Sequence, residues 1–220
     1  MVALVVLAVA WWFLKTGERQ MAPPLGKPIT SAPIKDSACY DKHWRFGTPE
    51  AENVVCRQTY LLGFPDRGGL ARWVAFKISP GKCIPKDYKD PNINAPVYDH
   101  RIEGYAKATL VPPRLVGGYD KADQQTGFKT LNVPMTAAMR KTWNKLNTSD
   151  YTHMLTGPFL NEKLPMDRSV VIPNRYFVIL FKQGKREAYW LANDSGIKTR
   201  TDIDDIEQKT GLTFFEKEIQ

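Results

Sequence analysis

The segment that most constrains the fold is Tyr176–Phe181 (YFVILF), an uninterrupted apolar run late in the chain. Its aromatic and β-branched residues favour an extended strand. A short apolar run without polar alternation is typical of a buried strand. Any fold of this chain must therefore provide a sheet in which this strand is covered.

Other segments supply neighbours for that strand. Asn53–Phe64 has the β-branched and aromatic content of one strand, and Arg72–Ile78 of a second. The turn sequence Pro65–Gly69 (PDRGG) between them predicts a hairpin. Two more strands are expected over Tyr151–Thr156 and Ala188–Ala192.

Two helices are expected beside these strands. Apolar residues fall at helical spacing within Thr136–Asn147. Thr201–Glu207 opens a short helix whose first turn is acidic, as the helix dipole favours, and Gly211 closes it. Together the elements predict an α+β domain with a central antiparallel sheet flanked by helices.

Composition narrows the class of protein. Of 220 residues, 43% are hydrophobic and 11% aromatic, which excludes a disordered chain. The formal net charge is +8. A basic surface favours nucleic acid, anionic lipid or an acidic protein as partner, and charge alone does not choose among them.

The chain begins with an apolar segment, Val2–Leu14. It is shorter than the roughly 20 residues of a spanning helix, although Trp11 and Trp12 suit a membrane interface. A cleaved signal peptide is the alternative, because Ala8–Ala10 has the small-x-small pattern of a cleavage site. Cleavage there would leave too short an apolar core, so residues 1–15 are interpreted as a retained membrane anchor.

A proline-rich strap follows the anchor over residues 16–50, and residues 51–220 form the folded domain. Basic residues after the apolar run favour the cytoplasmic or matrix-like side for that domain. The cysteines, Cys39, Cys56 and Cys83, lack the spacing of a zinc site. One disulfide with one free thiol and three buried thiols both stay open.

Several short motifs occur in a fixed order between about Asn53 and Phe215. Together they resemble the DNA/RNA non-specific endonucleases, the ββα-metal nuclease family that includes mitochondrial endonuclease G. The resemblance does not reach the N-terminal anchor or strap. The matching pieces are ARWVAFKI (Ala71–Ile78), VPP (Val111–Pro113), LNVP (Leu131–Pro134), the tryptophan of KTWNKL (Trp143), LTGPFL (Leu155–Leu160), VIPNRYFVILF (Val171–Phe181) and DDIEQKTGL (Asp204–Leu212).

The resemblance implies a catalytic centre of known parts. A strand pair leads to an Asp-Arg-Gly-His tetrad, whose histidine activates water. A helix supplies an asparagine that holds hydrated Mg²⁺ against the scissile phosphate, and a glutamate supports the water shell of the ion. Arginines steady the phosphate with paired donors.

This chain departs from that pattern at the tetrad. With Pro112 as the fixed point, the tetrad positions read Ala106–Thr109. Thr109 stands where the histidine belongs, and a hydroxyl is no base near pH 7. Lys107 replaces the arginine, which keeps the charge and loses the paired geometry.

The metal-binding part departs as well. The asparagine position falls on Met139 or Arg140, and neither ligates Mg²⁺. Arg140 would bring its own positive charge to the place of the metal. Asn147 stands where the glutamate is expected. We therefore expect a degenerate site with no catalytic residue, no metal and no cofactor, or Mg²⁺ if the protein is active.

Two sequences offer alternatives to this interpretation. His100 lies upstream of Thr109 and would be a displaced base in a shifted register, although a surface-loop histidine is the preferred interpretation. Asp66–Gly69 looks like the tetrad without its histidine, but it precedes the strand that the tetrad should follow.

Basic residues indicate a surface that grips a phosphate backbone without cutting it. Lys182, Lys185 and Arg186 either join that face or form a solvated charged turn. The candidate nucleic-acid contacts are Lys86, Lys89, Lys107, Arg114 and Arg140.

The sequence thus predicts a membrane-anchored, catalytically degenerate endonuclease-like protein that serves as a structural or interaction module. Its partners would be the membrane, through Val2–Leu14, and other protein subunits. An accessory role in a complex of the mitochondrial inner membrane or the bacterial envelope follows by analogy. The alternatives are a non-catalytic nucleic-acid binder and an active Mg²⁺-dependent endonuclease with a displaced base.

Overall fold

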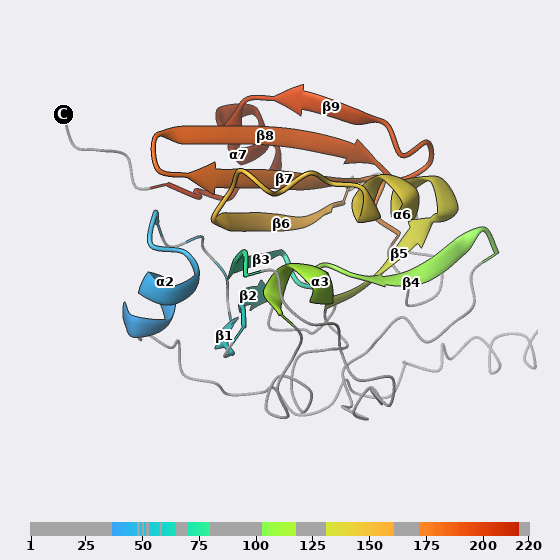
Figure 1. The fold of residues 1–220 in the computed structure, drawn as a ribbon. Coiled ribbons are helices and arrows are strands. Elements are labelled where there is room, and N and C mark those ends of the chain that lie inside the picture. Colours follow the sequence, from blue (N-terminus) through green and yellow to red (C-terminus); the bar gives the residue numbers. More distant parts are fainter. Residues whose placement is uncertain are drawn as a thin grey trace, which may run out of the picture.

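A seven-stranded sheet forms the centre of the molecule (Figure 1). The computed structural model describes residues 37–47, 49, 51, 53–57, 59–64, 70–79, 103–117, 131–160 and 172–215. The strand order is β1-β2-β3-β6-β7-β8-β9, and all neighbours are antiparallel. The strands are β1 (Asn53–Cys56), β2 (Leu61–Phe64), β3 (Trp73–Lys77), β6 (His153–Phe159), β7 (Arg175–Lys182), β8 (Lys185–Ala192) and β9 (Lys198–Thr201).

Strand β7 explains the apolar run in the sequence. Tyr176, Val178 and Leu180 belong to one buried cluster, whereas Phe177 and Ile179 belong to another. Successive side chains of a strand point to opposite faces, so the sheet is covered on both sides. The run is unbroken because neither face of β7 is exposed to water.

A smaller unit covers one face of the sheet. It consists of β4 (Tyr105–Thr109) paired antiparallel with β5 (Asn132–Thr136), together with α3 (Pro113–Val116) and α6 (Ala137–Asn144). Its buried side chains belong to the same cluster as Tyr176 and Val178 of β7. We call these four elements the ββα unit.

The opposite face is covered by α2 (Ser37–His43), α7 (Ile203–Thr210) and the segment after α7. Trp44, which follows α2, is fully buried, and its indole Nε1 donates to the carbonyl of Phe214 at 3.0 Å. α7 ends at Gly211, whose φ of 67° is the left-handed conformation that glycine adopts readily. The two ends of the described chain therefore meet on this face.

The structure confirms the α+β class and the central antiparallel sheet. The expected hairpin between β2 and β3 forms, and α6 and α7 lie where the sequence predicts helices. The prediction of one strand over Asn53–Phe64 is wrong. The polar stretch after Cys56 turns the chain, with Arg57 N bonded to Tyr60 O at 2.8 Å, so that β1 and β2 pair with each other.

Several predictions fall on residues outside the described part. They concern Val2–Leu14, His100, Lys86, Lys89 and the turn at Pro65–Gly69. Helix α2 lies within the range interpreted as a strap, residues 16–50. None of the helices in the described part has the length and hydropathy needed to cross a membrane.

Cys56 at the end of β1 is disulfide-bonded. Its partner lies outside the described side chains. Of the two alternatives left open by the sequence, the structure therefore supports a disulfide rather than three thiols. A disulfide is typical of an oxidising compartment.

Candidate functional site

Three of the residues that the sequence analysis selected, Lys107, Thr109 and Arg140, line one pocket of about 460 Å³ in the ββα unit. β4, α3 and α6 form its walls. We call it the basic pocket. Its described lining residues are Lys107, Ala108, Thr109, Pro112, Pro113, Arg114, Arg140, Trp143 and Asn144.

Strand β4 brings two of these side chains to the same side. Lys107 and Thr109 are two residues apart, and such residues share one face of a strand. Lys107 is exposed, whereas Thr109 is half-buried. The Thr109 hydroxyl accepts from the backbone N–H of Val111 at 3.3 Å. It therefore stabilises the turn that leads into α3.

Helix α3 positions Arg114. Pro112 and Pro113 begin this short helix with their fixed backbone, and Gly117 ends it with a φ of 73°. Arg114 Nη2 donates to the carbonyl of Trp143 at 3.2 Å, which ties α3 to α6. Its buried Nε has no hydrogen-bond partner within the described residues. Burial lowers the pKa of this guanidinium.

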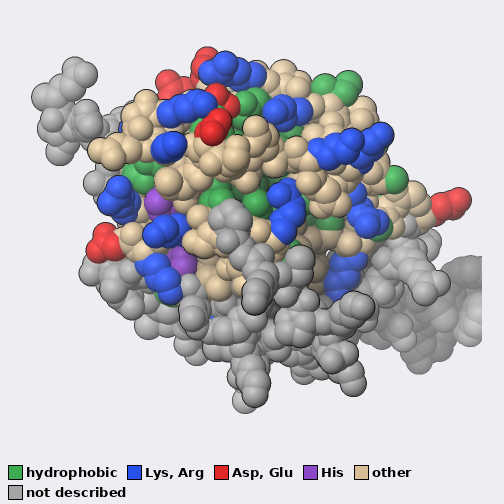
Figure 2. All heavy atoms as spheres, viewed as in Figure 1, with side chains coloured by type: hydrophobic (Ala, Val, Ile, Leu, Met, Phe, Trp, Pro, Cys, Tyr) green, Lys and Arg blue, Asp and Glu red, His purple; other side chains and the backbone are tan. Residues whose placement is uncertain are grey.

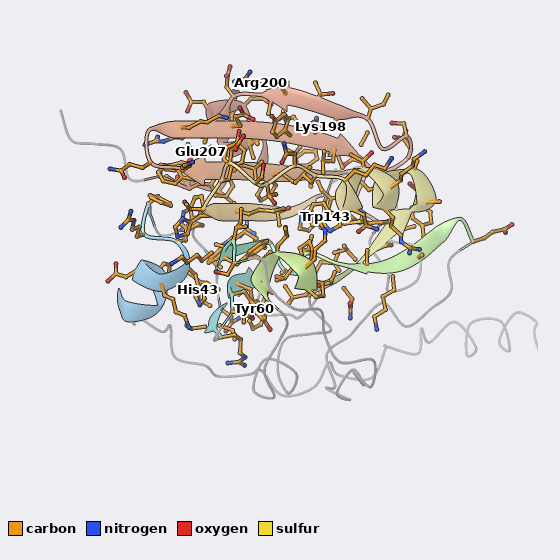
Figure 3. All side chains as sticks on the ribbon, viewed as in Figure 1. His43, Tyr60, Trp143, Lys198, Arg200 and Glu207 are labelled. Carbon is orange, nitrogen blue, oxygen red and sulfur yellow. The ribbon has the colours of Figure 1, made fainter. Side chains whose placement is uncertain are left out.

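Helix α6 supplies the other wall. Arg140 and Asn144 are four residues apart and therefore lie on the same helical face. Both are exposed, whereas Trp143 is only 3% exposed and points toward α3 (Figure 3). Thr136 caps the helix by accepting from Met139 N at 3.1 Å.

Asn193, which follows β8, joins the ββα unit to the main sheet. Its side-chain amide donates to the carbonyls of Pro134 and Pro173 at 3.0 and 2.7 Å. Its side-chain oxygen accepts from the backbone N–H of Thr136 at 3.2 Å. The Thr136 hydroxyl also donates to the Asn193 carbonyl. This one buried residue thus fixes the end of β5 and the start of α6.

Gly196 lets α6 approach the main sheet. A Cβ at this residue would lie 2.6 Å from the carbonyl oxygen of Ala138, and its φ of 69° disfavours other residues. The carbonyl of Gly196 also accepts from the Thr142 hydroxyl at 2.6 Å. Close backbone contact at this glycine therefore holds the wall that carries Arg140.

The structure brings four of the predicted residues together, namely Lys107, Thr109, Arg114 and Arg140. Of the two candidates for the asparagine position, Met139 is fully buried in the core and Arg140 lines the pocket.

Asn147 does not line the basic pocket. It lies beyond the end of α6, and its side-chain oxygen accepts from the backbone N–H of Ser149 at 3.1 Å. Sequence reasoning missed Asn144, although its spacing of four from Arg140 on a predicted helix is the signal that would have found it.

Positive charge dominates the pocket. Three cationic side chains line it, and its described lining contains no Asp, Glu or His. In the space-filling view, Lys and Arg side chains also spread over the region of α6 and β4 (Figure 2). No three His, Cys, Asp or Glu side chains within the described ranges are placed to hold a metal ion together. The pocket is therefore equipped to bind an anion by charge and hydrogen bonding.

The three other groups predicted as basic-face candidates lie elsewhere. Lys182, Lys185 and Arg186 belong to the β7–β8 hairpin. Lys185 lies 4.8 Å from the ring centre of Tyr151, and Arg186 lies 4.4 Å from that of Phe215. They do not line the basic pocket, which agrees with the interpretation as a charged turn.

No family model matches this chain, and no curated protein matches it either.

Proposed function

We propose that this chain is a catalytically degenerate DNA/RNA non-specific endonuclease-like protein that binds nucleic-acid phosphate without hydrolysing it. The observation that supports the proposal most directly is the basic pocket. Its lining combines the tetrad positions, Lys107 and Thr109, with Arg140 from the metal-binding position. Binding groups for an anion are present there, and the groups that would activate water are replaced.

The lack of hydrolysis follows from Thr109. General-base catalysis contributes roughly 10²–10⁴-fold to such reactions and needs a group with a pKa near neutral. A threonine hydroxyl does not deprotonate in that range, and here it accepts from Val111 N in a local turn. A nuclease that relied on this position would lose most of its rate.

The residues present do not fit Mg²⁺ either. A divalent ion of this kind prefers oxygen ligands, usually including a carboxylate. The described lining offers the hydroxyl of Thr109 and the amide of Asn144, next to three cationic side chains that would repel the ion. We derive no step through a metal and assign the neutralising role to Arg140.

The setting of the domain belongs to the same proposal. The apolar segment Val2–Leu14 would hold it at a membrane, with other protein subunits as partners. The disulfide at Cys56 favours an oxidising side of that membrane, in the mitochondrial intermembrane space or the bacterial envelope. This differs from the side that the basic residues after the apolar segment favour.

A binding assay at several salt concentrations tests the function. The full chain, purified in detergent, should shift labelled single-stranded DNA and RNA in a gel. The logarithm of its affinity should fall linearly with the logarithm of the salt concentration. The same protein should leave plasmid and RNA intact in Mg²⁺ or Mn²⁺. A flat salt response would contradict nucleic-acid binding, and cleavage that disappears in His100→Ala would show an active enzyme.

A further inference from the structure

The end of α2 is attached to the rest of the molecule by side chains rather than by a strand ladder. Among the described residues, its backbone hydrogen bond is local, from Trp44 N to Tyr40 O at 2.7 Å. The attachments are the His43 ring, which bonds the Arg57 carbonyl at 2.8 Å, and the Trp44 indole, which bonds that of Phe214. Strand β7, by contrast, is paired along its length with β6 and β8. A segment held in this way can open while the sheet stays paired.

His43 is the buried polar group of this attachment, at the end of α2 (Figure 3). The residue is only 1% exposed. A carbonyl oxygen only accepts, so Nε2 of the ring carries the proton that is donated to Arg57. Nδ1 of the same ring is buried and has no hydrogen-bond partner in the described structure. A second proton on this ring would therefore create a buried cationic donor without an acceptor, which is costly.

A second buried histidine, His153 on β6, lies beside the same attachment. It is 8% exposed, and its ring centre lies 5.3 Å from that of Phe46, edge to face. Phe46 in turn packs against Phe181 of β7, with ring centres 3.6 Å apart. The two histidines are close enough that charge on His43 lowers the pKa of His153. Protonation of one ring therefore opposes protonation of the other while the segment stays in place.

The charged surroundings of both rings are mainly cationic. Burial is the main cause that lowers the two pKa values to about 4; Lys42 lowers that of His43 further, and Arg45 and Lys77 lower that of His153. The other charged side chains on the elements packed here are Asp41 on α2, Arg57 after β1, Lys182 on β7, Arg186 on β8 and Glu207 on α7. Asp41 is exposed, and Glu207 accepts from Phe214 N. Opening of the segment would relieve the repulsion among these cations.

We propose that residues 40–47 form an acid-sensitive latch, which protonation of His43 and His153 releases from the sheet while β3, β6 and β7 stay paired. We call residues 40–47 the latch segment. Once released, both histidines bind protons near the ordinary pKa of 6.5, so the open state gains on the closed state as the pH falls from 6.5 to 4. Release uncovers the rings of Phe181 and Phe215, which contact Phe46 in the closed state. The inference is independent of the proposed function, because neither histidine lines the basic pocket.

Hydrogen–deuterium exchange of the full chain, purified in detergent with its disulfide intact, tests the latch. Amide protection is measured by mass spectrometry at about pH 7.5 and about pH 4.5 and corrected for the intrinsic pH dependence of exchange. One peptide covers the latch segment and another covers β7. A pKa that changes from about 4 to 6.5 on release gives a loss of protection of roughly 50–100-fold per histidine at the lower pH. We expect this loss in the latch segment and a much smaller one in β7.

Histidine variants identify the groups that carry the effect. His43→Gln retains a donor for the Arg57 carbonyl and does not titrate, so it should remove most of the pH dependence in the latch segment. His100→Gln, which alters the third histidine of the chain, is the matched control and should keep the full effect. Circular dichroism establishes that each variant is folded. If His43→Gln does not fold, His153→Gln takes its place and should remove the part that His153 contributes.

Three results would overturn the inference. Equal losses of protection in the latch segment and β7 would mean that acid unfolds the whole domain. Protection in the latch segment that does not change with pH would show that no latch opens. A loss that persists when both His43 and His153 are replaced by glutamine, or that disappears in His100→Gln, would assign the effect to another group. None of these measurements involves nucleic acid, so the proposed function is tested separately.

Discussion

The two polar pockets described in this molecule differ in how their charges are balanced. The basic pocket has three cationic side chains and a described lining without an acidic one. The other pocket, of about 270 Å³, lies between β8, β9 and the start of α7. There Arg186 and Arg200 face Glu187, Asp202 and Asp204, and we call it the balanced pocket. The difference is therefore one of lining: acidic side chains stand beside the arginines of the balanced pocket, and none is among the described residues that line the basic pocket.

Contacts around the balanced pocket strengthen this contrast. Glu187 accepts from the hydroxyl of Tyr189, and Lys185 lies 3.5 Å from its carboxylate. Hydrogen bonds from Tyr151 and Tyr189 are the main reason that the pKa of Glu187 falls to about 2. In the basic pocket, the Arg114 Nε finds no such partner among the described residues.

The largest predicted effect concerns the glycine that supports the basic pocket. Gly196→Val should lower the free energy of unfolding by about 3–5 kcal/mol, because a side chain would collide with the backbone of Ala138 at a positive φ. The measurement is chemical denaturation followed by circular dichroism.

Gly184 in the β7–β8 turn is the control for that glycine. It also has a positive φ, of 76°, but nothing lies within 4 Å of a Cβ built there. Gly184→Ala should cost only about 1–2 kcal/mol from backbone strain. Equal losses in the two variants would contradict the claim that close packing at Gly196 holds α6.

The next effect concerns the residue that joins the ββα unit to the main sheet. Asn193→Ala should lower the free energy of unfolding by about 2–4 kcal/mol, because buried carbonyls and N–H groups lose their partners. It should also weaken nucleic-acid binding in the basic pocket. Asn147→Ala, at an exposed turn, should change stability by no more than about 0.5 kcal/mol. Unaltered stability in Asn193→Ala would contradict the claim that Asn193 joins the ββα unit to the main sheet.

Acid should destabilise the protein at a place outside both pockets. Burial is the main cause that lowers the pKa values of His43 and His153 from 6.5 to about 4, and nearby Lys42, Arg45 and Lys77 lower them further. Between these pH values the unfolded chain binds more protons, so stability is lost as pH falls from 6.5 to 4.

We expect a loss of about 2–4 kcal/mol over that window, measured by denaturation at several pH values. A double variant in which both histidines become glutamine should show a flatter profile. The carboxylate of Glu187 titrates lower, near pH 2, so a loss confined to that range would place the acid sensitivity at the balanced pocket instead.

The smallest predicted effect is on the affinity for single-stranded nucleic acid. It is measured with one variant in each of the two pockets, which compares them directly. Arg140→Gln should weaken single-strand binding by about 1–1.5 kcal/mol and reduce the salt dependence by about one phosphate contact. Arg200→Gln, in the balanced pocket, should change the affinity by less than about 0.5 kcal/mol. A larger effect from Arg200 would reverse the assignment of the ligand to the basic pocket.

Sequence patterns predict the main sheet better than the ββα unit. The main sheet is built from apolar runs such as Tyr176–Phe181, which have few alternatives to a buried strand. β4 (YAKAT) and β5 (NVPMT) are short, and Pro134 in β5 argues against a strand because it cannot donate a ladder hydrogen bond. The pair forms because Asn193 and Tyr176 bond the carbonyl of Pro134, contacts that no local pattern contains.

The sequence predicts those residues of the candidate site whose positions follow from the register set by Pro112. Pro112 placed Lys107 and Thr109, and both line the basic pocket. The choice between Met139 and Arg140 required the phase of α6, in which Met139 shares the buried face of Trp143 four residues later. The unsatisfied Nε of Arg114 depends on how α3 packs against α6, which only the three-dimensional structure gives.

The hydrogen bond between Trp44 and Phe214 spans 170 positions of the chain. During synthesis on a ribosome, the indole emerges long before its acceptor exists. The face of the sheet that carries α2 and α7 therefore closes only after synthesis has passed Phe214, and such long-range closure is slow. Premature termination before Phe214 would leave a bulky aromatic group uncovered, which marks the product for chaperones or degradation.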